Sequence, residues 1–387
     1  MPISQSLARL IVASAILIMP VQGAAGKRPK CETVMAYAGK PPIAVPITTP
    51  PVAGKTPSSI KAERQNKLAF AFSDMMTKSK AVSMTVGLAD ADGPIWSATD
   101  GLTGSEKLHY WASVGKSYTA VVIMQLIENN QLSLDDRLSK WVKGVPNGDL
   151  ITIRMLLNHT SGLYSTNEDQ AATRNGTKSL TLKENIKVLK KHGALFCPGQ
   201  YWRYSNTGYY FLGLIAEKNY ALPLSQIIQV QIFDKIDLQN SHALSATDDV
   251  GNIAAPQPSA DQTSDLRSPG AAGPIAATSD NMIAFWRALL SGHLVKHATR
   301  DEMFAKLYPM FDDGMFYGLG VMAVRLPQPD GQLKTWVGHA GGMPGIRAFV
   351  MIDPTDHNYA AVALTGEGPA NAVAYQMLRA WQEAEIP

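Results

Sequence analysis

A serine and a lysine three residues apart, at the predicted start of a helix, constrain this chain more than any other feature. Ser113 and Lys116 begin a segment, 113–129, in which apolar residues recur at helical spacing. That spacing places both side chains on one face, one turn apart, so the lysine amine can reach the serine hydroxyl. The free N–H groups and the positive end of the dipole at a helix N-terminus favour a serine oxygen that becomes an anion. S-x-x-K is a known serine-nucleophile motif with that logic.

The same residues allow two other interpretations. Ser113 could cap the helix while Lys116 is solvated, because S-x-x-K arises by chance in most chains of this length. Gly115-Lys116-Ser117 also resembles the end of a phosphate-binding loop. That loop requires a glycine where Tyr110 stands, so the nucleotide-binding interpretation is rejected.

The balance of apolar and charged residues favours chemistry on a small molecule or peptide. The chain has 387 residues, 45% of them hydrophobic, which is enough material for a large core. Only 17% are charged, the formal net charge is +3, and the sequence lacks the Lys-rich or Arg-rich block that nucleic-acid binding needs. We therefore expect no nucleic-acid partner.

The N-terminus predicts an export signal over residues 1–25. Arg9 supplies the positive end, residues 10–21 are apolar, and small residues follow at 23–25. The apolar run is too short for a comfortable membrane span, so we expect no stable span after the signal is removed, although a retained anchor stays open. Residues 26–57 lack periodicity and predict an extended arm. A periplasmic or secreted protein is expected.

The two cysteines, Cys31 and Cys197, are a candidate disulfide. In an oxidising compartment a cysteine pair forms readily, and this bridge would pin the N-terminal arm to the body. Two unpaired thiols are the alternative, and the sequence leaves both open.

Strand patterns occupy the ends of the chain. Strands over 82–88 and 95–99, with a turn signal at 90–93, predict a hairpin that leads into the Ser113 helix. A helix over 58–78 is predicted before it, with these apolar residues expected to be buried: Ile60, Leu68, Phe70, Phe72 and Met75.

Helical patterns occupy the middle of the chain, at about 131–264, where strand signals nearly vanish. Beyond it, Thr278 is a candidate N-cap for a helix. A closing helix is predicted at Ala370–Glu383, after four strands: Tyr317–Arg325, Thr335–His339, Ile346–Asp353 and Asn358–Thr365. These patterns predict one α/β (α+β) body, about 58–130 and 265–387, with a large helical insertion.

Three further strings accompany the S-x-x-K motif, and the set carries a family resemblance. They are Leu156 to Leu163 (LLNHTSGL), Tyr204-Ser205-Asn206 and His339-Ala340-Gly341-Gly342. Over about residues 60–385 the set, in this order, resembles the serine β-lactamase and penicillin-binding superfamily. The branch it resembles contains class C β-lactamases, D-Ala-D-Ala carboxypeptidases, D-aminopeptidases and family VIII esterases.

The resemblance implies a fold as well as a chemistry. It implies a mixed, mainly antiparallel sheet flanked by helices, with a catalytic cleft between that body and the helical region. It implies no metal and no organic cofactor.

The resemblance also implies roles for the catalytic residues. Ser113 would attack the carbonyl carbon, Lys116 would take or relay its proton, and Tyr204 would be the second base, as a phenolate or as a hydrogen-bonded relay. Desolvation lowers the pKa of a lysine, and a neighbouring cation lowers the pKa of a tyrosine. Each of the two groups can therefore become a better base at neutral pH. The alternative for Tyr204 is an aromatic ring that packs beside Trp202 and Tyr209.

Substrate-binding roles follow in the same way. Asn206 would hold the lysine and the substrate amide, and the backbone N–H groups of Ser113 and Gly342 would form the oxyanion hole. Glycines such as Gly341 and Gly342 permit close backbone approach there. Residues 158–163, which include His159, would be a helix end capped by Gly162, with no catalytic role for the histidine.

One departure from the class C pattern stands out. His339-Ala340-Gly341 replaces Lys-Thr-Gly, which is closer to the carboxypeptidase-like and aminopeptidase-like relatives and puts efficient β-lactamase activity in doubt. A mostly neutral His339 would hold a substrate carboxylate less strongly than lysine. Arg347 is the competing carboxylate reader, although an ordinary surface arginine is the favoured interpretation of this residue. No separate deacylation glutamate is evident, so water attack would use Lys116 and Tyr204 again.

The expected function is an acyl-enzyme hydrolase that acts on an amide or ester. A D-amino-acid-containing peptide, cleaved as by a carboxypeptidase or aminopeptidase, is the favoured substrate. The alternatives are a family VIII-like carboxylesterase, a weak β-lactamase, and a penicillin-binding sensor without turnover. Loss of Lys116 or Tyr204 would mark the sensor, and both residues are present.

Overall fold

The computed structural model describes residues 31–52, 60–174, 178–258, 264–311, 314–327 and 331–383. The predicted signal at 1–25 lies outside these ranges, as do parts of the arm at 26–57. Among the helices that are described, none combines the length and the apolar character needed to cross a membrane.

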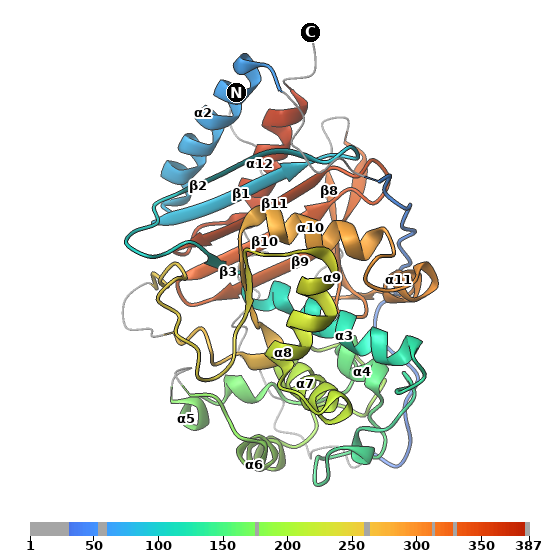
Figure 1. The fold of residues 1–387 in the computed structure, drawn as a ribbon. Coiled ribbons are helices and arrows are strands. Elements are labelled where there is room, and N and C mark those ends of the chain that lie inside the picture. The colour runs from blue at the N-terminus through green and yellow to red at the C-terminus, as the bar shows by residue number, and fades with distance from the viewer. Residues whose placement is uncertain are drawn as a thin grey trace.

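An eight-stranded sheet forms the upper half of the molecule (Figure 1). Its spatial order is β2-β1-β11-β10-β9-β8-β7-β6, and each neighbouring pair is antiparallel. The strands are β1 Ser83–Ala89, β2 Pro94–Asp100, β6 Tyr308–Pro309, β7 Met315–Tyr317, β8 Met322–Pro327, β9 Leu333–Met343, β10 Ile346–Ile352 and β11 Tyr359–Thr365. The expected antiparallel sheet flanked by helices is confirmed.

Helices cover both faces of this sheet. On the outer face lie α2 (Ala62–Ser79) and α12 (Ala370–Gln382), and α10 (Ser279–Leu290) lies on the opposite face (Figure 1). Met377 and Trp381 of α12, one turn apart, pack toward the sheet with Leu68 of α2. The Thr278 hydroxyl caps α10 and accepts a hydrogen bond from the Asn281 N–H at 3.3 Å, as the sequence predicts.

Two details of the predicted elements were wrong. Phe70 was expected to be buried but is 76% exposed, because α2 turns Leu68 and Phe72 inward and residue 70 lies on the other side. The strand predicted over 317–325 is split by a turn, in which the Gly318 N–H bonds to the Val321 carbonyl. Tyr317 therefore ends β7, and β8 starts afresh at Met322.

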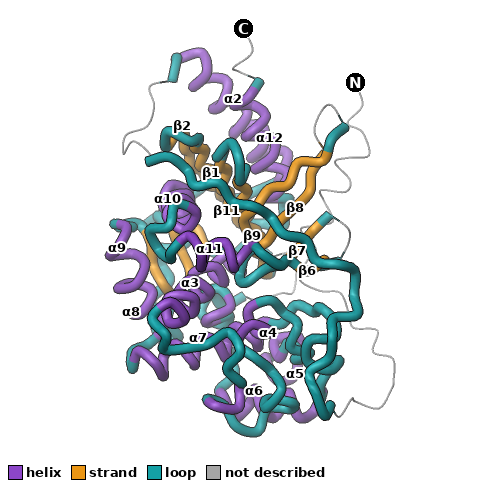
Figure 2. The backbone as a smooth tube through the Cα atoms, turned by 90° about the vertical axis from the view of Figure 1, so that its right-hand side faces the viewer, coloured by secondary structure: helices purple, strands orange, loops and turns teal. Residues whose placement is uncertain are grey.

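The lower half of the molecule is helical (Figures 1 and 2). A small second sheet, in the order β3-β5-β4, joins this region to the body, and its strand β4 lies where strand signals nearly vanish. The division into domains proposed from the sequence stays a prediction. The elements are β3 His109–Tyr110, β4 Ser241–Ala243, β5 Ile275–Ala277, α4 Ile153–Leu157, α5 Gln170–Thr173, α6 Leu182–His192, α7 Asn206–Tyr220, α8 Leu224–Ile228, α9 Asp234–Ile236 and α11 His297–Phe304.

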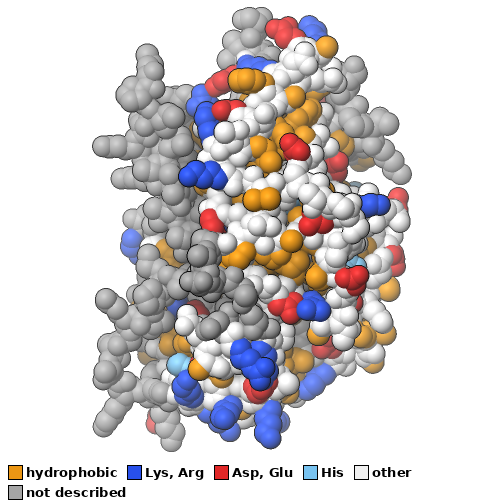
Figure 3. Space-filling view, turned by 90° about the vertical axis from the view of Figure 1, so that its left-hand side faces the viewer, with side chains coloured by type: hydrophobic (Ala, Val, Ile, Leu, Met, Phe, Trp, Pro, Cys, Tyr) orange, Lys and Arg blue, Asp and Glu red, His pale blue; other side chains and the backbone are white. Residues whose placement is uncertain are grey.

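Basic side chains gather at the lower end of the face in Figure 3, whereas acidic and basic ones are interspersed above. Helix α6, in the lower region, ends on Lys190, Lys191 and His192. Cations in the last turn of a helix complement its dipole, so the charge of the residues that end α6 has a structural explanation.

Helix α3 (Lys116–Glu128) runs through the centre of the molecule and is buried on every side over residues 116–126. It follows a 3-10 turn, Ala112–Gly115. Because the 3-10 turn packs against β9 and β10 while α3 packs against α7 and α8, the start of this helix lies at the junction of the two halves (Figure 1).

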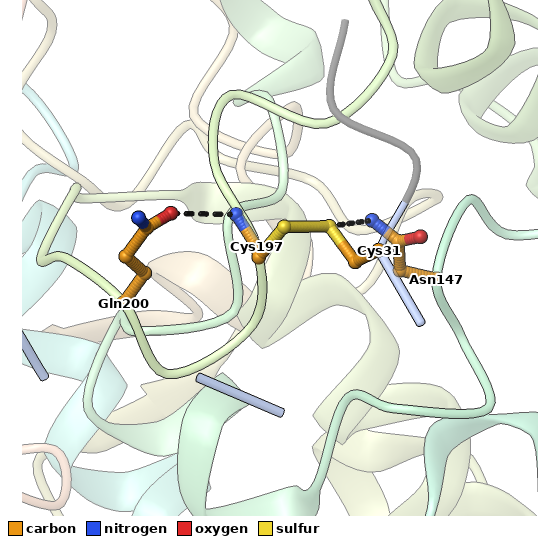
Figure 4. Close-up of a disulfide and its surroundings, with 4 residues drawn as sticks. All are labelled: Cys31, Asn147, Cys197 and Gln200. Carbon is orange, nitrogen blue, oxygen red and sulfur yellow. Dashed lines mark hydrogen bonds between the residues drawn. A yellow bond between two sulfur atoms is a disulfide. The ribbon is translucent and has the colours of Figure 1, made fainter. Parts of the chain in front are cut away.

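A disulfide joins Cys31 to Cys197, with 5.6 Å between the Cα atoms (Figure 4). The structure thus resolves the alternative that the sequence leaves open. Beyond Cys31 the arm crosses to the body, where Ile43 pairs with Leu307 and the Thr48 hydroxyl donates to the Pro354 carbonyl at 2.6 Å. The arm therefore ties the helical region to the sheet region.

Reduction of this bridge should lower the free energy of unfolding by about 2–4 kcal/mol, as is typical for a native disulfide. The measurement is urea unfolding of the oxidised and reduced protein, with the double variant Cys31→Ser/Cys197→Ser as the control. That variant should not respond to reductant. Two free thiols in the unfolded, unreduced protein would contradict the bridge.

Candidate active site

Ser113 and Lys116 meet as the sequence predicts. Ser113 is partly exposed in the 3-10 turn, whereas Lys116 begins α3 and is fully buried. The lysine Nζ lies 3.0 Å from the serine Oγ and donates a hydrogen bond to the Ala272 carbonyl at 2.6 Å. Ala272 ends a 3-10 turn, Gly270–Ala272, that packs against α7.

The environment of Lys116 suits a base. Burial holds the pKa of Lys116 well below its usual range. Within the described part of the chain, no carboxylate forms an ion pair with this amine. Burial therefore favours the neutral amine, whose lone pair can accept the serine proton.

Tyr204 lies beside the nucleophile and the lysine. The Lys116 Nζ lies 4.9 Å from the centre of its ring. Burial raises the pKa of Tyr204, and the nearby Ser113 side chain offsets only part of this effect. The tyrosine is thus a neutral phenol, and the relay role fits this site better than the phenolate role.

Asn206 lies beside the site but its side chain points elsewhere. Its Nδ2 donates to the Asn167 Oδ1 at 3.0 Å, and its backbone N–H donates to the Ser165 Oγ at 2.9 Å. The expected hold of Asn206 on Lys116 is therefore not supported, because the Ala272 carbonyl accepts the bond from the amine. Asn206 and the exposed Asn167 form an amide pair that faces solvent.

Strand β9 runs past the nucleophile. Its pairing with β8 ends at Gly338, whereas its pairing with β10 continues to Met343. A Cβ added at Gly341 would lie 2.3 Å from the Trp111 carbonyl and 3.2 Å from the Ser113 nitrogen. Only glycine permits this approach, and Gly342 is the next residue along the strand.

His339 is the main departure from the expected site. Its side chain is 1% exposed, its Nε2 lies 2.9 Å from the Tyr317 hydroxyl and its Nδ1 lies 2.7 Å from the Ala340 carbonyl. Burial, assisted by the charge that Lys116 can carry, lowers the pKa of His339 to about 3. The expected contact with a substrate carboxylate is not supported, because both nitrogens already have protein partners.

The proton positions in this network follow from counting donors. The Ala340 carbonyl can only accept, so the neutral His339 carries its proton on Nδ1. The Nε2 then accepts from the Tyr317 hydroxyl, and the Tyr209 hydroxyl donates to the Leu157 carbonyl at 2.9 Å. This arrangement leaves no proton for the long 3.4 Å contact between Tyr317 and Tyr209.

Arg347 does not replace His339 as a carboxylate reader. Its guanidinium forms an ion pair with Glu367 and donates to the carbonyls of Met343 and Ile346, at 2.7 and 2.8 Å. These bonds brace the β9–β10 hairpin, so Arg347 has a structural role.

Sequence reasoning missed three residues of the site, Asn167, Ala272 and Tyr317, and gave His159 only a structural role at a helix end. Ala272 acts through its carbonyl oxygen, which no side-chain pattern reveals. Tyr317 reaches His339 across two strands. His159 belongs to the LLNHTSGL string, which was the one available signal, and its ring lies 4.3 Å from that of Tyr204.

The described residues hold no group of three His, Cys, Asp or Glu side chains that could bind a metal ion.

Comparison with known proteins gives matches to one family and to solved structures of this fold. A family model described as Beta-lactamase matches residues 68–384. Penicillin-binding protein 4* of Bacillus subtilis (strain 168) is 26% identical over 276 residues, which are 66% of this chain. The match spans 60% of that relative's own length. Esterase EstB of Burkholderia gladioli is 28% identical over 150 residues, which are 35% of this chain and 38% of the esterase.

Two solved structures share the fold. The D-amino acid amidase of Ochrobactrum anthropi SV3 aligns with a TM-score of 0.73, at 21% identity over 84% of this chain and 99% of its own. At that identity the likeness shows the fold alone. The D-stereospecific amidohydrolase of Streptomyces sp. aligns with a TM-score of 0.66, at 26% identity over 85% of this chain and 99% of its own.

The buried amine should make stability depend on pH. Above its lowered pKa the folded Lys116 is neutral, whereas the unfolded lysine stays protonated up to its ordinary pKa of 10.5. Unfolding then takes up a proton, so the free energy of unfolding rises with pH by up to about 1.4 kcal/mol per unit. Lys116→Met should lack this rise, measured by urea unfolding at a series of pH values below 10.5. Parallel pH dependences would contradict a neutral lysine.

The bonds of His339 predict no effect on substrate charge preference. His339→Gln should lower kcat/KM for a carboxylate substrate and its matched amide by the same factor, because the change acts through Tyr317 and β9. The ratio of the two kcat/KM values, measured in wild type and variant, checks this. A ratio that shifts by more than about tenfold, roughly 1.4 kcal/mol, would restore His339 as the carboxylate reader.

Proposed function

Because this chain belongs to the β-lactamase family, we propose that it is a serine hydrolase that forms an acyl-enzyme at Ser113 on an amide or ester. One observation carries the proposal. A partly exposed serine Oγ lies 3.0 Å from a buried amine, and that amine lies 4.9 Å from the ring centre of a buried phenol, Tyr204. A serine that merely caps a helix needs neither neighbour, and a buried, unpaired lysine costs stability.

The geometry supports a balanced sequence of proton transfers. Lys116 accepts the Ser113 proton as Oγ attacks the carbonyl carbon, and the C–O bond forms. The oxyanion is stabilised by the backbone N–H groups of Ser113 and Gly342. When the tetrahedral species collapses, Tyr204 donates its proton to the leaving nitrogen or oxygen and regains one from Lys116. In deacylation, Lys116 accepts a proton from the attacking water, with Tyr204 as the relay. That proton returns to the Ser113 Oγ as its bond to the acyl carbon breaks, which releases the acid and regenerates Ser113.

For the substrate we propose an amide or peptide that contains a D-amino acid. The amidohydrolase and amidase that share the fold are named for D-amino acid or D-stereospecific amide chemistry, and an amide needs the proton donor that Tyr204 supplies. A carboxylesterase is the second candidate, supported by the esterase relative. Weak β-lactamase activity and a penicillin-binding sensor remain alternatives that the assay below separates.

We further propose that the protein works outside the cytoplasm. The signal-like N-terminus and the Cys31–Cys197 bridge support this, since disulfides persist in oxidising compartments.

Ser113→Ala should abolish covalent labelling by a fluorophosphonate and all turnover, with an unchanged melting temperature, because it removes one partly exposed hydroxyl and no core volume. Lys116→Ala and Tyr204→Phe should each lower kcat by on the order of 10², as when a general base is lost. Turnover by Ser113→Ala near the wild-type rate would refute the nucleophile.

A matched substrate panel distinguishes the candidates. D-amino acid amides and D-peptides, their L-enantiomers, short p-nitrophenyl esters and nitrocefin are compared by kcat/KM. Preference for D-amides supports the proposal, whereas turnover of esters alone supports the esterase. Stable labelling by penicillin without turnover of any substrate supports the sensor.

A further inference from the structure

His159 is hydrogen-bonded to the backbone on both sides of Tyr204. The Ser205 N–H donates to the His159 Nδ1 at 3.2 Å, and the Arg203 N–H donates to the His159 carbonyl at 2.9 Å. The residues before and after the tyrosine are therefore both bonded to one residue.

The ring of His159 also packs directly on Tyr204. The two ring centres are 4.3 Å apart, and the ring of Tyr317 lies 4.4 Å away on the same histidine. The side chain is 1% exposed, and within the described residues its Nε2 has no hydrogen-bond partner. Ring packing and the two backbone hydrogen bonds of His159 thus both constrain the position of Tyr204.

The charge state of His159 is set by these contacts. Because Nδ1 accepts a hydrogen bond, the proton of the neutral ring lies on Nε2. Burial, with the charges that Lys116 and His339 can carry, holds the pKa of His159 well below its usual range. The ring is neutral, so it adds no positive charge beside the amine that must accept the serine proton.

We propose that His159 is a positioning residue that orients the Tyr204 hydroxyl toward Ser113, an inference that rests on the proposed function. Few residue types meet the demands of this position. The backbone has a φ of +62°, in the left-handed region where His, Asn and Asp are enriched. The side chain must also offer an acceptor to the Ser205 N–H at a point close to the backbone. A helix-end role for His159, which follows α4, would not require its side chain to contact Ser205 and Tyr204.

Two amide variants test whether the hydrogen-bond acceptor at the Nδ1 position of His159 is the feature that matters. In His159→Asn the Oδ1 stands near the position of Nδ1 and tolerates the left-handed backbone, whereas in His159→Gln the amide reaches the position of Nε2. We expect His159→Asn to keep the acylation rate by p-nitrophenyl acetate within about fivefold, and His159→Gln to lose about 30-fold or more. His159→Phe, which keeps a ring but no acceptor, should also lose it. KM should change little, because no substrate contact is removed.

A double-mutant cycle tests whether the effect passes through the tyrosine. In the Tyr204→Phe background, His159→Gln should lower the residual rate by less than about twofold, because the hydroxyl that it positions is absent. A general structural defect would lower both backgrounds by the same factor.

His357 provides a matched control. It is also buried, has a φ of +56°, bonds through one nitrogen to the Thr48 hydroxyl at 3.0 Å, and leaves its other ring nitrogen without a partner among the described residues. His357→Asn and His357→Gln should change the melting temperature but leave the acylation rate equal in the two variants.

The outcomes are distinct. Equal rates for His159→Asn and His159→Gln, or additive effects with Tyr204→Phe, overturn this inference while Ser113-dependent turnover stands. A full rate in Ser113→Ala overturns the proposed function and this inference together. The positioning role is supported if His159→Asn keeps the acylation rate and His159→Gln lowers it only when Tyr204 is present.

Discussion

The burial of one amine is the constraint on which the site depends. Lys116 lies at the start of a helix that is enclosed on every side, and its Nζ can be satisfied only by what surrounds it. The Ala272 carbonyl and the Ser113 hydroxyl fill that need. An apolar side chain would fit such a core at lower cost, which is the usual relation between stability and an active site.

The groups around Lys116 come from elements that are widely separated in the sequence. The 3-10 turn at 112–115 presents the serine, the turn at 270–272 supplies the carbonyl, and β9 passes close enough to require glycine at Gly341. Tyr204 is then held from the helical side. Because the site spans the junction of both halves, its geometry depends on how firmly the arm and the interior packing hold these halves together.

Much of this could be predicted from residue patterns, and the failures have physical reasons. Alternating strands and the Thr278 cap were visible because they depend on neighbours in sequence, and the motif order indicated Ser113, Lys116 and Tyr204 as partners. The burial of Phe70 was predicted wrongly because residue hydrophobicity alone does not reveal which side of α2 meets the sheet. His339 looked like a substrate contact until Tyr317, from another strand, was found on its nitrogen. Contacts made by carbonyls, such as that of Ala272, leave no mark in the sequence.

The disulfide divides the catalytic residues topologically. It closes a covalent loop between Cys31 and Cys197 that contains Ser113 and Lys116, while Tyr204 follows just after the loop closes. A protease that cuts within the loop, for instance beside the exposed Gln170, would produce two chain segments that stay one molecule. Such a nick would leave the nucleophile and the tyrosine covalently connected, and it would be visible on a gel only after reduction.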